Sequence, residues 1–102
     1  MELKKGFKDE QSAVIKRLLE QALFDNRLSK SHFNLYMAFC WIWLSRGYPD
    51  YLFLFSHDVM PIAKISSSAT FVKNMHELEQ MGYLYYKRSN YKRKPSKIKI
   101  MI

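Results

Sequence analysis

The sequence is poor in the residues that build disulfides, phosphate-binding loops and sharp turns. It has one cysteine, three glycines and three prolines among 102 residues. Cys40 cannot form an internal disulfide, and its apolar neighbours indicate a small buried side chain, which is typical of a reduced cytoplasmic protein. The glycines are not grouped, so the sequence has no glycine-rich loop for a nucleotide phosphate.

Long hydrophobic runs are also missing. The longest run, residues 35–44, has about half of the ~20 apolar residues that a membrane-spanning helix needs. The chain starts with the polar sequence MELKKGFKDEQ, which differs from the charged start and apolar segment of a signal peptide. We therefore expect a cytoplasmic protein without a membrane partner.

Acidic residues disappear from the last part of the sequence. All nine acids lie at or before Glu79, whereas seven of the 17 lysines and arginines follow it. The formal net charge of +8 is therefore concentrated at one end, because the ten other basic residues are nearly balanced by the acids. Such a gradient attracts polyanions, chiefly nucleic acid or an anionic membrane.

Hydrophobic residues make up 48% of the chain, which is enough for the core of one compact domain. Apolar residues recur every three to four positions in three predicted helices, at residues 9–24, 29–47 and 67–81. Ser29 or Ser31 is suited to cap the start of the second helix, and Gly47 to end it. Ser67 is suited to cap the third, and Gly82 to end it.

A further helix is predicted at residues 56–65, with Ser56 as its N-cap. Pro61 lies inside this segment, where a proline removes a backbone hydrogen bond and clashes with the preceding turn. We therefore expect that this helix either begins late, near Met60, or has a distorted first turn.

Three segments have the character of β-strands, at residues 51–55, 83–89 and 96–102. In the last segment Lys97 and Lys99 alternate with Ile98 and Ile100, which indicates a strand with one buried face rather than a disordered tail. The basic sequence NYKRKP joins the second segment to the third. We expect these two strands to form a β-hairpin with a basic loop.

The predicted order after residue 50 is strand, helix, tight turn, helix, strand, basic loop and strand. With the preceding helix, this order is typical of a winged helix-turn-helix domain. The expected fold is mainly α with a small β-sheet. It comprises a winged helix-turn-helix at residues 29–102 and an additional N-terminal helix within residues 1–28, in one compact unit.

The second predicted helix is apolar on nearly all sides, and the first has a broad apolar face. That surface predicts either a homodimer interface or simply closure of the core. Trp41 and Trp43 are two positions apart on a helix and point to different sides. We therefore expect one of them to be exposed or to lie in an interface.

Small polar residues at the start of the second helix of such a motif can approach base edges in the major groove of DNA. The predicted base contacts are those of Ser67, Ser68, Ala69, Thr70, Lys73 and Asn74. Cations of the hairpin would contact the flanking phosphate backbone, where released counterions dominate the affinity. The predicted backbone contacts are those of Lys87, Arg88, Tyr91, Lys92, Arg93, Lys94 and Lys97.

Residues 66–100 also carry an ordered set of motifs: a Ser-x-x-Thr-aromatic opening, a helix end M-x-E-L-x-x-x-G-Y, a wing with Tyr and Ser, and a closing S-x-V/I strand. The matching residues are Ser67, Thr70, Phe71, Met75, Glu77, Leu78, Gly82, Tyr83, Tyr86, Ser89, Ser96 and Ile98. In this order they resemble small winged-helix proteins of bacterial mobile elements, namely conjugative and mobilizable transposons of gut anaerobes. The resemblance covers roughly residues 31–102.

The resemblance implies sequence-specific binding of double-stranded DNA in the bacterial cytoplasm, in association with the nucleoid. The implied role is transcription regulation, excision or mobilization of the element. Two positions depart from the pattern. Pro61 interrupts the helix before the turn, and Arg88 stands where a proline is common, which favours stronger contact with phosphates.

Two other non-catalytic functions remain open. A winged-helix fold can serve as a protein-interaction module, because a fold does not fix a function, and this one would suit an acidic surface of a recombinase or relaxase. Alternatively, the basic, tyrosine-rich wing would bind RNA by stacking bases on its exposed rings.

Enzymatic activity and a metal site are not expected. His32, His57 and His76 lack the spacing of metal ligands and are predicted to lie at the surface or at element edges. The serines at 66–68 are explained by turn and capping chemistry, because no base or oxyanion site accompanies them. We therefore predict no catalytic residue, no cofactor and no small-molecule ligand.

Overall fold

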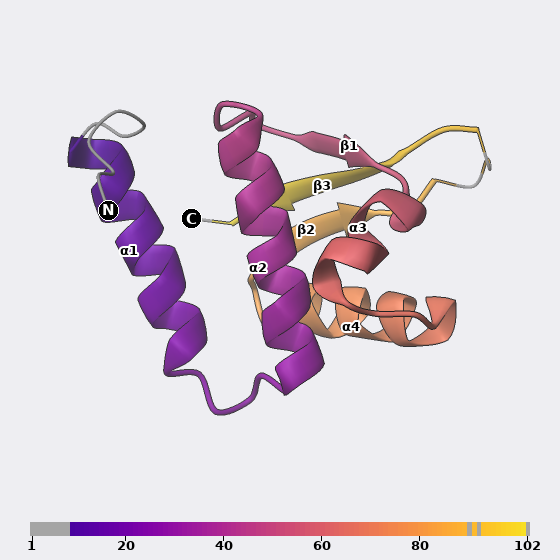
Figure 1. Cartoon of the computed structure of the whole chain (residues 1–102), viewed down its shortest axis with the longest axis horizontal. Coiled ribbons are helices and arrows are strands. Elements are labelled where there is room, and N and C mark those ends of the chain that lie inside the picture. Colours follow the sequence, from indigo (N-terminus) through magenta and orange to yellow (C-terminus); the bar gives the residue numbers. More distant parts are fainter. Residues whose placement is uncertain (1–8, 90, 92, 102) are drawn as a thin grey trace.

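The structure is a computed structural model and describes residues 9–89, 91 and 93–101. This part of the chain forms four helices and a three-stranded antiparallel sheet (Figure 1). The elements in chain order are α1 (Asp9–Leu23), α2 (Lys30–Ser45), β1 (Leu52–Leu54), α3 (Ser56–Ala63), α4 (Ser68–Gln80), β2 (Leu84–Lys87) and β3 (Ser96–Ile100). A mainly helical fold with a small sheet is thus confirmed.

The last strand lies at the centre of the sheet, in the order β1-β3-β2. Ile98 is paired with Leu52 of β1 on one side and with Tyr86 of β2 on the other. Both pairings are antiparallel, so the predicted hairpin of β2 and β3 is confirmed. Residues with buried side chains alternate along each strand and define one inner face, namely Leu52, Leu54, Leu84, Tyr86, Ile98 and Ile100.

The helix α2 supplies the centre of the core. It lies across the inner face of the sheet (Figure 1), and its side chains of Leu35, Tyr36 and Phe39 are completely buried. Burying an aliphatic or aromatic side chain of this size stabilises the fold by ~1.5–3 kcal/mol. Cys40 is buried as expected, and burial raises the pKa of its thiol to about 11, which keeps it protonated at neutral pH.

The start of α2 is fixed by a reciprocal cap. The Ser29 hydroxyl accepts the His32 N–H at 3.2 Å, and His32 Nδ1 accepts the Ser29 N–H at 2.9 Å. Because Nδ1 accepts, the ring proton is on Nε2, which donates to Glu77 Oε1 of α4 at 2.8 Å. His32 thus lies at the start of α2, as expected of an element edge, but it is 8% exposed rather than on the surface, and it joins α2 to α4.

The helix α3 begins earlier than its proline suggests. It starts at Ser56, with Phe55 rather than Ser56 as N-cap, and continues through Pro61 to Ala63. The predictions of a late start near Met60 and of a Ser56 cap are therefore wrong. Asp58 stabilises the first turn by accepting the Phe55 N–H at 3.2 Å. Pro61 lies on the exposed side, where water can bind the carbonyl that the proline leaves unpaired.

The helix α1 packs through Leu18 and Ala22, which are both 3% exposed. The loop that follows it is tied to the end of α4 by Tyr83, whose hydroxyl donates to Asp25 Oδ2 at 2.7 Å. Arg27 Nη2 lies at the same distance from that oxygen. Hydrogen bonds from Arg27 and then from Tyr83 hold the pKa of Asp25 well below its usual value of 3.8.

The lowered pKa of Asp25 predicts a pH dependence of stability. Ionised Asp25 stabilises the folded protein above about pH 4, and this contribution is lost as the pH falls toward the depressed folded-state pKa. We therefore expect the Asp25→Asn protein to be less stable than wild type at pH 7, with a difference that narrows on acidification to pH 3. Urea unfolding at several pH values measures it, and a difference independent of pH would contradict the prediction.

Candidate nucleic-acid interface

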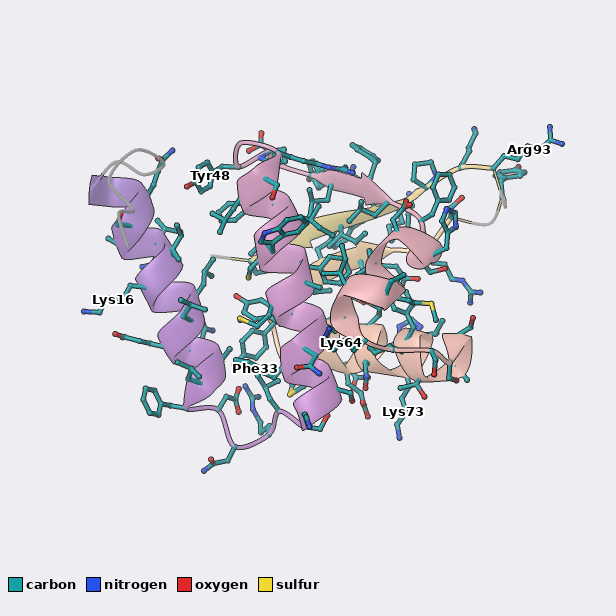
Figure 2. The ribbon with its side chains drawn as sticks, in the orientation of Figure 1. Lys16, Phe33, Tyr48, Lys64, Lys73 and Arg93 are labelled. Atoms are coloured by element: carbon teal, nitrogen blue, oxygen red, sulfur yellow. The ribbon has the colours of Figure 1, made fainter. Side chains whose placement is uncertain are left out.

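The start of α4 presents a row of small exposed side chains. Ser67 is the N-cap, and its hydroxyl accepts the Thr70 N–H at 3.3 Å. The predicted base-contacting residues that are exposed are Ser67, Ser68, Ala69, Thr70 and Lys73. Figure 2 shows the side chain of Lys73 pointing away from the body of the molecule. Five of the six predicted residues therefore lie together on an accessible surface.

Asn74 does not belong to this surface, and its predicted base contact is corrected. It is 4% exposed, and its Nδ2 donates to Ser31 Oγ of α2 at 2.9 Å. The reason is helical geometry, because position 74 follows Phe71 by three residues and precedes Leu78 by four. Both of those residues are buried, so this spacing was the sequence signal that places Asn74 on the core side.

The β2–β3 loop (residues 88–95) carries exposed cations beyond the end of the sheet. Arg88, Arg93 and Lys94 are exposed, and Figure 2 shows Arg93 at the outer end of the loop. Tyr91 is 68% exposed, with Lys94 Nζ at 5.4 Å from the centre of its ring. Of the predicted backbone contacts, Lys92 lies outside the described residues.

Serine hydroxyls give this loop a defined shape. Ser89 Oγ donates to the Tyr91 carbonyl at 3.0 Å and accepts the Tyr91 N–H at 3.2 Å. The Ser89 N–H donates to Ser96 Oγ across the hairpin at 3.1 Å. These bonds join Ser89 to Tyr91 and to the first residue of β3, so the base of the loop is tied to the sheet.

A surface hollow of about 470 Å³ joins the loop to the helices. Its apolar floor includes Phe39, Phe71 and Ile98. Polar and basic residues from three elements also line it: Ser56 and His57 of α3, Ser68 of α4, and Arg88, Ser89, Tyr91 and Lys94 of the loop. The described residues that line it include no carboxylate. The start of α4 and the basic loop therefore border one concave, cationic surface.

Lys87 and Lys97 lie elsewhere than in the loop. They are cross-strand neighbours on β2 and β3, and Lys97 Nζ lies 4.0 Å from the centre of the Tyr51 ring. Their side chains belong to the outer face of the sheet, opposite the core. Lys99 lies on the same face, and it was not among the predicted contact residues. The alternation of lysine and isoleucine along β3 was the signal for this placement.

Among residues 9–89, 91 and 93–101, His, Cys, Asp and Glu form no group of three that could hold a metal ion. None of the described helices has the length and apolar character needed to cross a membrane. Compared with protein families, with curated proteins and with solved structures, the chain gives no match.

The structural role of Asn74 is testable. Asn74→Ala removes the hydrogen bond to Ser31 and a buried side chain, so we expect the free energy of unfolding to fall by about 1–3 kcal/mol. Lys73→Ala, a change at the exposed neighbouring position, is the control and should alter it by less than about 0.5 kcal/mol. Urea unfolding of both proteins gives the comparison. Equal effects would contradict the assignment of Asn74 to the core.

Proposed function

We propose that the chain is a winged helix-turn-helix protein that binds double-stranded DNA without catalysis. In this proposal α3 and α4 are the helix-turn-helix, α4 is the recognition helix and the β2–β3 loop is the wing. The observation that carries it is the shared hollow, because Ser68 at the start of α4 and Arg88 and Lys94 of the loop line the same concave surface. A surface of this sign and shape suits the phosphates beside a major groove.

The first turns of α4 suit the reading of bases. Its 13 residues span about 20 Å, and a single helix fits the ~12 Å width of the major groove. Ser68 and Ala69 are short, so the backbone can approach the base edges closely. The methyl groups of Ala69 and Thr70 can contact a thymine methyl, and Lys73 can reach guanine or a phosphate. The positive end of the helix dipole also favours a phosphate there.

The wing supplies affinity rather than specificity. The β2–β3 loop, which carries the exposed Arg88, Arg93 and Lys94, extends from the sheet on the side away from α1 (Figure 1). In this proposal its cations follow the sugar–phosphate backbone. Each neutralised phosphate releases counterions, so such contacts strengthen binding to any sequence. On a bacterial mobile element, DNA binding through α4 and the wing would serve transcription regulation, excision or mobilization of the element.

The dependence of DNA affinity on salt tests this proposal. Fluorescence anisotropy with a labelled random-sequence duplex gives the slope of log K against log salt concentration. We expect the Arg93→Ala, Lys94→Ala double variant to flatten that slope by about two units, because each lost phosphate contact removes ~0.9. Arg17→Ala, which removes an exposed arginine from α1 at the far end of the molecule, is the control and should leave the slope unchanged.

Two results would overturn the proposal. The first is the absence of detectable association with duplex DNA at low salt, which would favour a protein-interaction module. The second is a slope that is the same in wild type and in the double variant, since the wing would then contribute no phosphate contact.

A further inference from the structure

The outer face of the sheet carries a second group of aromatic and basic side chains. Its residues are Tyr51 just before β1, Phe53 of β1, Tyr85 and Lys87 of β2, and Lys97 and Lys99 of β3. The aromatic rings are accessible, with Phe53 54% exposed, Tyr85 39% and Tyr51 38%. All three strands bury the alternate residues against α2 and α4, so these six side chains are on the opposite face.

Strand register brings the rings and the cations together. Lys97 of the central strand has Phe53 opposite it on β1 and Lys87 opposite it on β2. In the next row of this face Lys99 is opposite Tyr85. Neighbouring strands are ~4.8 Å apart, so Lys97 has the Phe53 ring and Lys99 the Tyr85 ring one strand away. Lys87 follows Tyr85 by two residues on the same strand and face.

Three lysines at this density are unfavourable for the isolated protein. Lys87 and Lys97 are directly opposite each other, and like charges in that position destabilise a sheet. The Tyr51 ring offsets part of this repulsion, because its centre is 4.0 Å from Lys97 Nζ and 5.5 Å from Lys99 Nζ and a cation is attracted to the face of an aromatic ring. In the described part of the chain, the ion pairs of the structure involve none of these three lysines. A bound anion would remove the repulsion.

The combination of rings and cations specifies the chemistry of a ligand. Exposed rings on a flat sheet provide stacking surfaces for bases, and neighbouring ammonium groups neutralise phosphates. The bases of a duplex are stacked on each other and cannot reach a flat protein face, whereas those of a single strand can. We propose that the outer face of the sheet binds single-stranded nucleic acid, with bases on Phe53 and Tyr85 and phosphates at Lys87, Lys97 and Lys99.

This surface is separate from the start of α4. The helices α2, α3 and α4 pack on the inner side of the sheet, whereas the six residues are on its outer side (Figure 1). The inference goes beyond the proposed function, because duplex binding uses α4 and the wing. Substitutions within the strands therefore separate the two activities, provided that the wing is left unchanged.

The test compares strand variants on single-stranded and duplex probes. Fluorescein-labelled dT and U oligomers of ~12 nucleotides cover the usual site size of such platforms and distinguish DNA from RNA. Phe53→Thr and Tyr85→Thr remove the rings but keep residues suited to strands. We expect each variant to bind the preferred single strand about tenfold or more weakly, with duplex affinity changed less than about twofold. Phe24→Ala, at an aromatic residue 80% exposed beyond α1, is the control.

Single-strand affinity that survives both ring substitutions would overturn the inference, as would no binding of either oligomer at low salt. Circular dichroism of each variant establishes that the fold is retained. If single-strand binding is absent, the test of duplex binding in the proposed function is unaffected. If duplex binding alone is absent, the proposed function is refuted and this inference still holds.

A groove between α1 and α2 supports a second, independent inference. It is a hollow of about 200 Å³ with Leu18, Cys40 and Trp43 among its deeper residues and with side walls from both helices, namely Ile15, Leu19, Met37, Trp41 and Leu44. Trp41 is 59% exposed, whereas Trp43 is buried and its Nε1 donates to the Pro49 carbonyl at 2.9 Å. The expectation that one of the two tryptophans is exposed is thus confirmed.

The charged residues beside this groove would complement the same residues of a second copy. On α1 the exposed charged residues Lys16 and Glu20 lie beside the exposed apolar residues Leu19 and Leu23. Within one copy they form an i, i+4 ion pair with 3.8 Å between Lys16 Nζ and Glu20 Oε1, and a second copy would have to exchange this pair for two between the helices. If two α1 helices pack antiparallel about a two-fold axis, Lys16 of each copy meets Glu20 of the other. We infer that a second copy of this chain covers the groove, which forms a homodimer.

Reciprocal charge changes test this interface. Sedimentation velocity across micromolar concentrations should show a dimer for wild type and a dissociation constant raised about tenfold or more by Trp41→Ser. We expect Lys16→Glu and Glu20→Lys each to weaken self-association, and an equimolar mixture of the two variants to restore it, because acidic and basic helices then meet. A monomeric wild-type protein throughout this range, or a mixture that stays monomeric, would overturn the inference.

Discussion

The alternation of side chains along β3 is the constraint on which the rest of the structure depends. Ile98 and Ile100 enter the core while Lys97 and Lys99 face solvent, and a slip of one residue would exchange the two sets. Because β3 is paired on both sides, its register also positions β1 and β2. The same register determines where the β2–β3 loop leaves the sheet, and therefore places its cations beside the start of α4.

Two part-buried polar contacts then fix α4 against α2. His32 of α2 donates to Glu77, and Asn74 donates to Ser31, so the start of one helix holds the side of the other in a single orientation. Buried polar groups of this kind specify an arrangement because each is costly without its partner. Consequently α4 presents its first turns and Lys73 to solvent, and this exposed edge is the part available to a duplex in the proposed function.

Local signals in the sequence were sufficient for most elements. The Ser67 cap, the helix stop at Gly82 and the hairpin follow from capping chemistry, positive φ at glycine and two-residue alternation. The buried position of His32 did not follow from such signals, because its partner Glu77 is 45 residues away in the sequence. The spacing of Asn74 from Phe71 and Leu78 indicates the core side, but its bond to Ser31, 43 residues away, was not predictable from local signals. The aromatic and basic outer face was missed for the same reason, since three separate strands assemble it.

The central claim is that the start of α4 and the β2–β3 loop form one surface for duplex DNA. Amide chemical-shift mapping by NMR, during titration with a short duplex, tests it most directly. The account predicts that the amide chemical shifts of residues 67–73 and 88–94 change together, with one common dissociation constant. The amide chemical shifts of α1 should not change. Shifts confined to α1 or to the outer face of the sheet, or two segments that titrate with different constants, would contradict it.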